Sequence, residues 1–231
     1  IDLLKQNLDY YFKNIDMVFH LSANADVRNG LNNRKKDLEQ NIIVTHKILE
    51  QLVKNKIKKF AFSSSGSVYG DTKQIPTNED CPLPIQTSLY GASKISAEAF
   101  IEAYAEAYNI NSYIFRFVSI LGPRYSHGHV FDFTRQLLKN PKILYVLGDG
   151  NQRKSYLHVK DCIKAIWLSI NKFKKKINRV NLGTNEYFTV KASIKTICNR
   201  LDLKPKLIFK GGKRGWIGDN PLILLDIKKI K

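Results

Sequence analysis

The sequence predicts an α/β protein with a mainly parallel β-sheet. Short runs of β-branched and aromatic residues alternate with longer helical patterns, as expected where each strand is followed by a helix that covers the sheet. Hydrophobic residues make up 43% of the 231 residues, which is enough to form a buried core. No internal repeat or low-complexity tract interrupts this order.

Two strands and two helices are expected in the first half of the chain. The strands are 15–22 (IDMVFHLS) and 57–65 (IKKFAFSSS), both short and apolar. Residues 38–54 form a helix by the spacing of their apolar residues, and residues 90–108 by their high content of Ala and Glu. Residues 1–14 have the pattern of the end of a further helix.

A third strand is expected at 112–120 (SYIFRFVSI), and beyond Leu121 the pattern becomes less regular. The elements expected there are helices at 130–140, 158–172 and 190–202, a short strand at 143–147, and short apolar segments at 179–183 and 206–209. A soft boundary near residue 121, without a flexible linker, divides the chain into residues 1–121 and 122–231.

The net charge of +18 raises the question of a nucleic-acid partner. The lysines are scattered through segments such as KNKIKK and NKFKKKINR, without RNP-type aromatics, zinc-finger spacing or a helix-turn-helix pair. We therefore expect a solvated, lysine-rich surface and no specific nucleic-acid binding. The charge also favours anionic, phosphorylated substrates.

Cysteine usage and hydropathy indicate the compartment. No stretch approaches the roughly 20 apolar residues of a membrane span, and the first residues lack the features of a signal peptide. The three cysteines are far apart and have no CxxC spacing: Cys81, Cys162 and Cys198. We expect a soluble, cytoplasmic protein without membrane contact. His127, His129 and Asp132 are not completed by a Cys or Glu, so no metal site is expected.

One helix carries a pair of residues suited to proton transfer. In Tyr90-Gly-Ala-Ser-Lys94 the i, i+4 spacing places a phenol and an ammonium on the same face, one turn apart. A nearby ammonium favours the phenolate, so we expect the pKa of Tyr90 to lie below its usual value of about 10. Tyr90 is then the expected general base. The spacing alone also fits a surface pair, and its context decides between the two.

Four segments in order supply that context: VFHLSA, FSSSGSVYG, YGASK and RFVSILGPR. Together they resemble the extended short-chain dehydrogenase/reductase family that acts on nucleotide sugars. The resemblance implies a Rossmann-like, doubly wound parallel sheet and an NAD cofactor. It also implies that residues 1–121 are a partial NAD-binding domain. Residues 122–231 would then be mainly a smaller α/β part that binds the nucleotide sugar, with some elements returning to the sheet.

The same resemblance implies roles for residues around the helix. Ser65 occupies the place of the serine that hydrogen-bonds the sugar hydroxyl, which makes the catalytic set Tyr90, Lys94 and Ser65. Lys94 would also hold the nicotinamide ribose. The cofactor-binding residues implied are Leu21, Ser22, Ala23, Asn41, Ser63, Tyr90, Lys94 and Phe117.

The chain departs from the family pattern at its beginning. The family opens with a strand and a GxxGxxG turn, which hold the pyrophosphate of the dinucleotide. Here Gly30 stands alone, and GGKRGWIG lies near the other end without a strand-to-helix context. We expect that roughly the first two βα units, of about 30 residues each, are absent. The chain alone is then expected to bind NAD poorly and to be inactive.

Substrate-binding residues are implied in the second half. Ser119 stands where many relatives have an asparagine, which puts its contact in question. His129 and Val130 lie in the segment that faces the diphosphate in relatives, and Tyr145 and Leu147 lie where the base is flanked.

A phosphate-binding cation is implied by two further segments. GDGNQRKSYLHVKD resembles the family's GxGxxxRDxxxVxD segment, with Lys154 in the place of the arginine and Arg153 beside it, so either could bind phosphate. GGKRGWIGDNP resembles the closing RxGD motif and implies Arg214 for phosphate and Asp219 for a ribose or loop contact. Arg124 fits a surface ion pair and substrate binding equally.

The residues around the serine indicate the reaction. Related 4,6-dehydratases have Thr-Asp-Glu where this chain has Ser65-Gly66-Ser67, so the acid needed to eliminate water is missing there. A C4 epimerase of nucleotide-diphosphate sugars, acting through a 4-keto intermediate on UDP-glucose and UDP-galactose or their N-acetyl equivalents, needs one base and a hydride acceptor. A dehydratase or reductase of the same family, and an incomplete fragment that serves only as a binding or scaffold protein, stay open. Relatives form homodimers through the helices that correspond to 38–54 and 90–108, which implies the same here.

Overall fold

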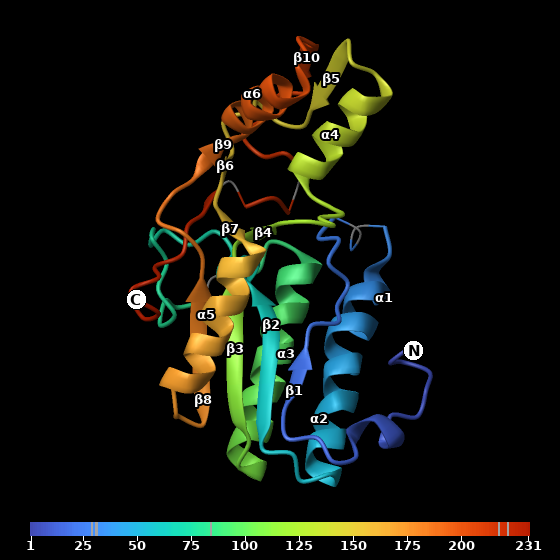
Figure 1. Cartoon of the computed structure of the whole chain (residues 1–231), viewed down its shortest axis with the longest axis vertical. Helices are drawn as coiled ribbons and strands as arrows, with labels where there is room; N and C mark the ends of the chain where they lie inside the picture. The colour runs from blue at the N-terminus through green and yellow to red at the C-terminus, as the bar shows by residue number, and fades with distance from the viewer. Residues whose placement is uncertain (29, 31, 84, 217, 221) are drawn as a thin grey trace.

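The computed structural model describes residues 1–28, 30, 32–83, 85–216, 218–220 and 222–231. Four parallel strands form the main sheet, in the spatial order β1 (Val18–His20), β2 (Lys59–Ser65), β3 (Asn111–Phe117) and β8 (Ile177–Leu182). Strand β8 comes from the second half of the chain and pairs with β3 at one edge, while β1 lies at the other (Figure 1). The predicted α/β fold with a parallel sheet is confirmed.

Helices cover both faces of this sheet. Alternate side chains of β2 point to opposite sides, because successive residues of a strand do so. Phe60 and Phe62 pack in one core with helices α2 (Val44–Lys54) and α3 (Leu89–Tyr108). Ala61 packs in a second core that includes residues of α5 (Val159–Lys172), on the other face. The sheet is therefore a buried layer between two layers of helices (Figure 1).

The second part of the molecule lies beyond the carboxyl ends of the sheet strands (Figure 1). Its core contains residues of α4 (His129–Lys139), α6 (Val190–Leu201) and β5 (Ile143–Val146). Strand β5 pairs in parallel with β10 (Lys206–Phe209). The remaining short strands are β4 (Ser119–Leu121), β6 (Arg153–Lys154), β7 (Tyr156–His158), β9 (Phe188–Thr189) and β11 (Leu222–Ile223).

The helices expected at 130–140, 158–172 and 190–202 are confirmed by α4, α5 and α6. The helix expected at 38–54 begins earlier, since α1 (Arg34–Asp37) and a π-helical segment (Leu38–Ile43) run into α2 without a break. A π-helical turn inside an α-helix is rare and is frequent at functional sites.

Three predictions of local structure are wrong in detail. Residues 1–14 do not form the end of a helix, because only Asp9–Phe12 are helical, as one 3-10 turn. The buried side chains of Leu8 and Phe12 belong to the core that includes α2. The strand expected at 15–22 is reduced to β1. The strand expected at 112–120 is two strands, because the chain leaves the main sheet after β3 and β4 pairs with β7.

No helix among the described residues is long and apolar enough to cross a membrane.

Candidate active site

Strand β2 ends in three serines at the carboxyl edge of the sheet. Ser65 is its last residue and the cap of the following 3-10 helix Gly66–Tyr69, since its Oγ accepts a hydrogen bond from the Ser67 amide at 3.1 Å. A Cβ at Gly66 would lie 2.6 Å from Ile223 and 3.2 Å from the Phe117 carbonyl oxygen. Only glycine fits there, so the 3-10 turn packs closely against Ile223 and Phe117, and Ser65 is partly buried in the cavity wall.

Helix α3 begins beside this turn. Ser88 caps it, because its Oγ accepts a hydrogen bond from the Gly91 amide at 3.0 Å. An added Cβ at Gly91 would lie 3.0 Å from the Ser67 carbonyl oxygen, so glycine permits the close approach of the helix to the 3-10 turn. Tyr90 is thereby placed in the first turn of α3, next to Ser65.

The three predicted catalytic residues lie together. Tyr90 and Ser65 line the same cavity, and Ser65 lies close enough to the phenol to lower its pKa through hydrogen bonding. The Lys94 ammonium lies 5.9 Å from the centre of the Tyr90 ring, 4.8 Å from that of Phe62, and donates to the Ser63 carbonyl at 2.8 Å. Lys94 is only 2% exposed. A phenol, a hydroxyl and a buried ammonium therefore converge at the end of β2.

The electrostatics of Tyr90 differ from the sequence prediction. Burial raises the pKa of Tyr90 to about 12, while its hydrogen bond with Ser65 lowers it and the Asp37 carboxylate raises it. Burial lowers the pKa of Lys94 to about 8, against the raising effect of Glu98 and Asp37. The expectation of a phenol pKa below 10 is wrong for this structure, because the loss of water at the phenol outweighs the lowering effect of Ser65, and Lys94 is not among the groups that shift this pKa.

Residues near the end of β1 connect the cofactor side to α3. Asn41, in the π-helical segment, accepts a hydrogen bond from the Asn24 amide at 2.8 Å and donates to Ser93 Oγ at 2.8 Å. Ser93 Oγ in turn donates to the Tyr90 carbonyl at 2.8 Å. Asn41 is itself buried, so in the structure it holds the loop after β1 against the helix that bears Tyr90.

The donors at this edge fit the ribose end of a dinucleotide. Lys94 has three N–H donors, of which the Ser63 carbonyl accepts one, and Ser63 Oγ donates to the His20 carbonyl at 3.2 Å. Leu21 and Ser22 are exposed and Ala23 is half-buried directly after β1. Dinucleotides bind at the carboxyl ends of parallel strands, which is where these groups lie.

A cavity of about 660 Å³ opens at the same edge, between the sheet and the second part. The predicted residues that line it are Ser65, Tyr90, Phe117, Ser119, His129, Tyr145, Leu147, Lys154 and Asp219. The predicted residues that do not line it are Leu21, Ser22, Ala23, Asn41, Ser63, Lys94, Val130, Arg153 and Arg214. Arg124 is exposed and also lies outside the lining.

Of the two adjacent cations, Lys154 faces the cavity. Its ammonium binds Asp219 Oδ1 at 2.7 Å and the Asn220 carbonyl at 3.0 Å. Arg153, on the opposite side of the short strand β6, stacks over the Tyr187 ring at 5.1 Å from its centre. The structure thus separates two residues that sequence reasoning could not.

Arg214 points away from the cavity. It forms an ion pair with Asp71 and donates to the Asp219 carbonyl at 2.8 Å. Asp219 also accepts the Gly215 amide at 3.0 Å, so the loop 214–219 is closed on itself by internal bonds. In this structure Arg214 therefore holds the loop that places Asp219 beside Lys154.

His129 contributes a neutral ring to the cavity wall. Its Nε2 lies 2.6 Å from the Tyr156 hydroxyl. Burial lowers the pKa of His129 to about 4; Lys154 also lowers it, and Asp219 raises it. No group of three or more His, Cys, Asp or Glu in the described part of the chain could hold a metal ion.

Several residues of the cavity were not predicted from the sequence as site residues, among them Arg28, Ser67, Tyr125, Gln152, Trp216 and Asn220. Ser67 and Gln152 lie inside segments that already carried the resemblance, so their position was a usable signal. Arg28 gave no such signal in the sequence. It forms an ion pair of 3.1 Å with Asp132 of α4, which is 104 residues away in the chain, so only folding brings the two together.

Comparison with known proteins agrees with this arrangement. The model of the NAD dependent epimerase/dehydratase family matches residues 1–183. The "Putative UDP-glucose 4-epimerase" of Methanocaldococcus jannaschii is 33% identical over 99% of this chain and 74% of its own length. The UDP-glucose 4-epimerase of Halalkalibacterium halodurans is 28% identical, and the match covers 87% of this chain and 65% of the relative.

Solved structures give the same result. The crystal structure of a UDP-galactose 4-epimerase superposes with a TM-score of 0.84 at 30% identity, over 94% of this chain and 70% of that one. The UDP-glucuronic acid 4-epimerase from Bacillus cereus, solved with UDP-glucuronic acid and NAD, superposes with a TM-score of 0.89 at 27% identity. The match covers 100% of this chain and 72% of that chain. The chain belongs to the NAD-dependent epimerase/dehydratase family, within the extended short-chain dehydrogenase/reductases.

Proposed function

We propose that this chain carries the catalytic and substrate-binding residues of an NAD-dependent C4 epimerase of nucleotide-diphosphate sugars. The observation that supports it best is that Tyr90 and Ser65 lie together in the wall of one cavity, with the buried Lys94 ammonium 5.9 Å from the centre of the Tyr90 ring. The proposed substrates are UDP-glucose and UDP-galactose or their N-acetyl equivalents. Relatives and structural neighbours are named for UDP-sugar epimerases, which supports this class.

In the proposed reaction Tyr90 removes the proton of the sugar 4-hydroxyl, and Ser65 holds that hydroxyl by a hydrogen bond. NAD, when bound, would supply the acceptor for the C4 hydride and the donor for its return to the other face. The phenolate is the form of Tyr90 that accepts this proton, and Lys94, which is proposed to hold the cofactor ribose, supplies positive charge that favours the phenolate. Between the two half-reactions the 4-keto sugar turns about its phosphate linkage inside the cavity.

The second part is proposed to hold the nucleoside diphosphate. Lys154 is the proposed phosphate cation, because it lies in the cavity wall whereas Arg153 does not. His129 is proposed to face the diphosphate and Asp219 the ribose, and both line the cavity. Val130 is also proposed to face the diphosphate, although it lies outside the lining of the cavity. The remaining proposed contacts are Ser119 to the sugar, Tyr145 and Leu147 to the base, and Arg214 to a phosphate after release from Asp71.

An elimination reaction lacks its acid in this part of the site. Ser67 donates no proton comparable to that of a carboxylic acid, and Ser65 and Ser67 bond to each other at 3.1 Å. A reductase would use the same Tyr90 but release its cofactor after each turnover. Whether the purified full-length protein retains stoichiometric NAD through gel filtration separates the epimerase from a reductase.

Assembly and location are also proposed. Exposed apolar residues lie on the two helices expected to form a homodimer, including Ile43, Phe100 and Tyr108. All three cysteines are free and buried, which suits a reducing compartment such as the cytoplasm. Sedimentation of the full-length protein tests the dimer.

The test of the function is direct. Full-length protein with NAD is incubated with UDP-glucose, UDP-N-acetylglucosamine and their C4 epimers, and the nucleotide sugars are separated by chromatography. Conversion within at least one pair is expected. A folded, NAD-loaded protein that converts none of the four would contradict the proposal.

A further inference from the structure

Helix α3 contacts the end of strand β2 at three successive turns. Residues 90, 94 and 98 are spaced by four and therefore lie along one face of the helix. The three contacts join Tyr90 with Ser65, Lys94 with Ser63, and Glu98 with Ser64. Each of the serines 63–65 is thus tied to a different turn of α3.

The third contact belongs to a residue that the proposed reaction does not use. Glu98 is 1% exposed and accepts a hydrogen bond from Ser64 Oγ. Its carboxylate also forms an ion pair with Arg116 of the neighbouring strand β3. Arg116 Nη2 lies 2.6 Å from Glu98 Oε2, and Arg116 Nε lies 3.1 Å from Glu98 Oε1. Arg116 also donates to the Tyr69 hydroxyl at 2.8 Å, at the end of the 3-10 turn that follows Ser65.

We propose that Glu98, held by Arg116, is a positioning residue of the active site, which fixes the serine segment 63–65 against α3 and sets a negative charge one turn from the Lys94 ammonium. The inference rests on the proposed function of Tyr90, Lys94 and Ser65. Glu98 touches neither the cavity nor a reacting atom, so it acts only through its neighbours.

The titratable groups around Lys94 come from several elements. They are His20 on β1, Asp37 on α1, Tyr90 and Glu98 on α3, and Arg116 on β3. Burial holds His20 neutral by lowering its pKa to about 3, and Lys94 lowers it further. Burial lowers the pKa of Lys94 to about 8, and of the two carboxylates that oppose this, Glu98 has the larger effect. Loss of the Glu98 charge should therefore let the ammonium lose its proton near neutral pH.

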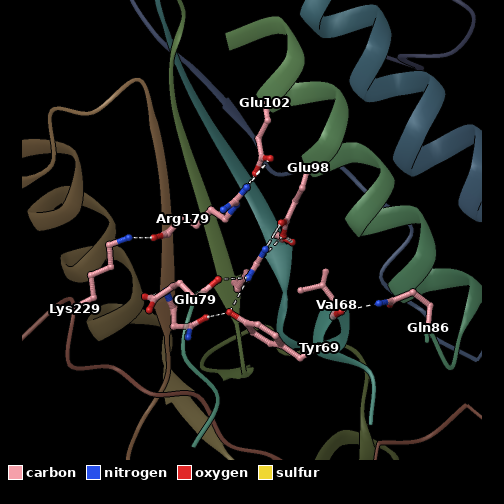
Figure 2. Close-up of polar contacts among 11 residues, drawn as sticks. Val68, Tyr69, Glu79, Gln86, Glu98, Glu102, Arg179 and Lys229 are labelled. Atoms are coloured by element: carbon pink, nitrogen blue, oxygen red, sulfur yellow. Dashed lines mark hydrogen bonds and ion pairs between the residues drawn. The ribbon is translucent and has the colours of Figure 1, made fainter. Parts of the chain in front are cut away.

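The competing interpretation is that the buried pair only stabilises the fold. A matched pair on the same helix separates the two. One turn further along α3, Glu102 binds Arg179 of strand β8 at 2.7 Å, which is again a two-contact glutamate and arginine pair (Figure 2). Glu102 is directed to β8 instead of the serine segment, and it is not among the groups that affect Lys94.

The experiment compares Glu98→Gln with Glu102→Gln. The pKa of the Lys94 ammonium is measured by NMR on protein labelled in its lysine side chains, with Lys94→Arg identifying the signal. Glu98→Gln is expected to lower that pKa by about one pH unit or more, and Glu102→Gln to leave it unchanged. Glu98→Asp keeps the negative charge, so its Lys94 pKa is expected to lie close to that of the unchanged protein.

The result does not depend on turnover, so it is separate from the test of the epimerase. An unchanged Lys94 pKa in folded Glu98→Gln, or an equal shift in Glu102→Gln, overturns the proposal. If Glu98→Gln does not fold because Arg116 is left unpaired, the double variant Glu98→Gln with Arg116→Met removes both buried charges. Its Lys94 pKa should also fall, by less than expected for Glu98→Gln alone because the Arg116 cation is lost too, and a value equal to that of the unchanged protein overturns the proposal as well.

Discussion

Lys154 and Asp219 form an ion pair of 2.7 Å on the wall of the cavity, although 65 residues separate them in the chain. The pair brings a cation to the side of the cavity opposite the sheet strands. Asp219 is itself held by the Gly215 amide, so the ammonium is fixed in place before any anion arrives. A preorganised cation of this kind suits a phosphate group.

Lys154→Ala should weaken binding of UDP and UDP-sugars by about tenfold or more, because a hydrogen bond to a charged group contributes about 1.5–3 kcal/mol. Arg153→Ala is the matched control, since its guanidinium stacks on Tyr187 outside the cavity. The affinity of Arg153→Ala for UDP should stay within about twofold of that of the unchanged protein. Isothermal titration with UDP measures both. A larger loss for Arg153→Ala than for Lys154→Ala would reverse the assignment.

Tyr90→Phe should reduce kcat of the full-length protein by a factor of about 100 or more, because no other group at the end of β2 is placed to take the proton. The fold should be retained, as one hydroxyl is removed from the first turn of α3. Tyr108→Phe, at the exposed end of the same helix, is the control and should keep its activity. Retained turnover in Tyr90→Phe would remove the phenol as base.

The core between the sheet and α2 should dominate stability. Leu52→Ala, at a fully buried site, should lower the free energy of unfolding by about 2–5 kcal/mol through lost burial and a residual cavity. Leu138→Ala, at a site that is 73% exposed, should change it by less than about 0.5 kcal/mol. Urea unfolding followed by circular dichroism compares the two. Similar losses in both variants would contradict the placement of the core.

Acid should destabilise the chain through His129. Burial depresses its folded-state pKa to about 4 from an ordinary value of 6.5, so between these values the unfolded chain binds the proton and the folded chain does not. The free energy of unfolding should therefore fall as the pH drops from about 6.5 to about 4, by at most about 1.4 kcal/mol per pH unit for this group.

His129→Gln should make the pH dependence of unfolding less steep in that window. His127→Gln, two residues earlier and exposed, should leave the slope as it is. Urea midpoints measured from pH 4 to pH 7 give the slopes. A slope unaffected by His129→Gln, or reduced equally by both variants, would contradict a half-buried, neutral ring at position 129.

Helix geometry was sufficient to predict that Tyr90 and Lys94 share one face of α3, because the i, i+4 spacing fixes it. Ser65 was added by the resemblance of its segment to the family, and the structure places it at the end of β2 beside Tyr90. The pKa of Tyr90 was not accessible in this way. Its value depends on how much water the folded chain removes from the phenol, which no spacing in the sequence records.

Long-range contacts account for the rest. Which of Arg153 and Lys154 faces the cavity is decided by the register of β6 with β9 and β11, because side chains alternate along a strand. Arg214 was predicted to bind phosphate from its motif, yet its position depends on Asp71, 143 residues away. The helix predicted for the first fourteen residues was wrong, because the apolar Leu8 and Phe12 belong to a segment that is mostly loop and pack in the core with α2.

The central claim is that Tyr90 works as the base in a C4 epimerisation. The most direct test incubates NAD-loaded full-length protein with UDP-galactose and its N-acetyl equivalent and follows the sugar by proton NMR. Appearance of the C4 epimer, lost in Tyr90→Phe, is the predicted result. Accumulation of a dehydrated 4-keto-6-deoxy sugar, or epimerisation that persists without the phenol, would contradict it.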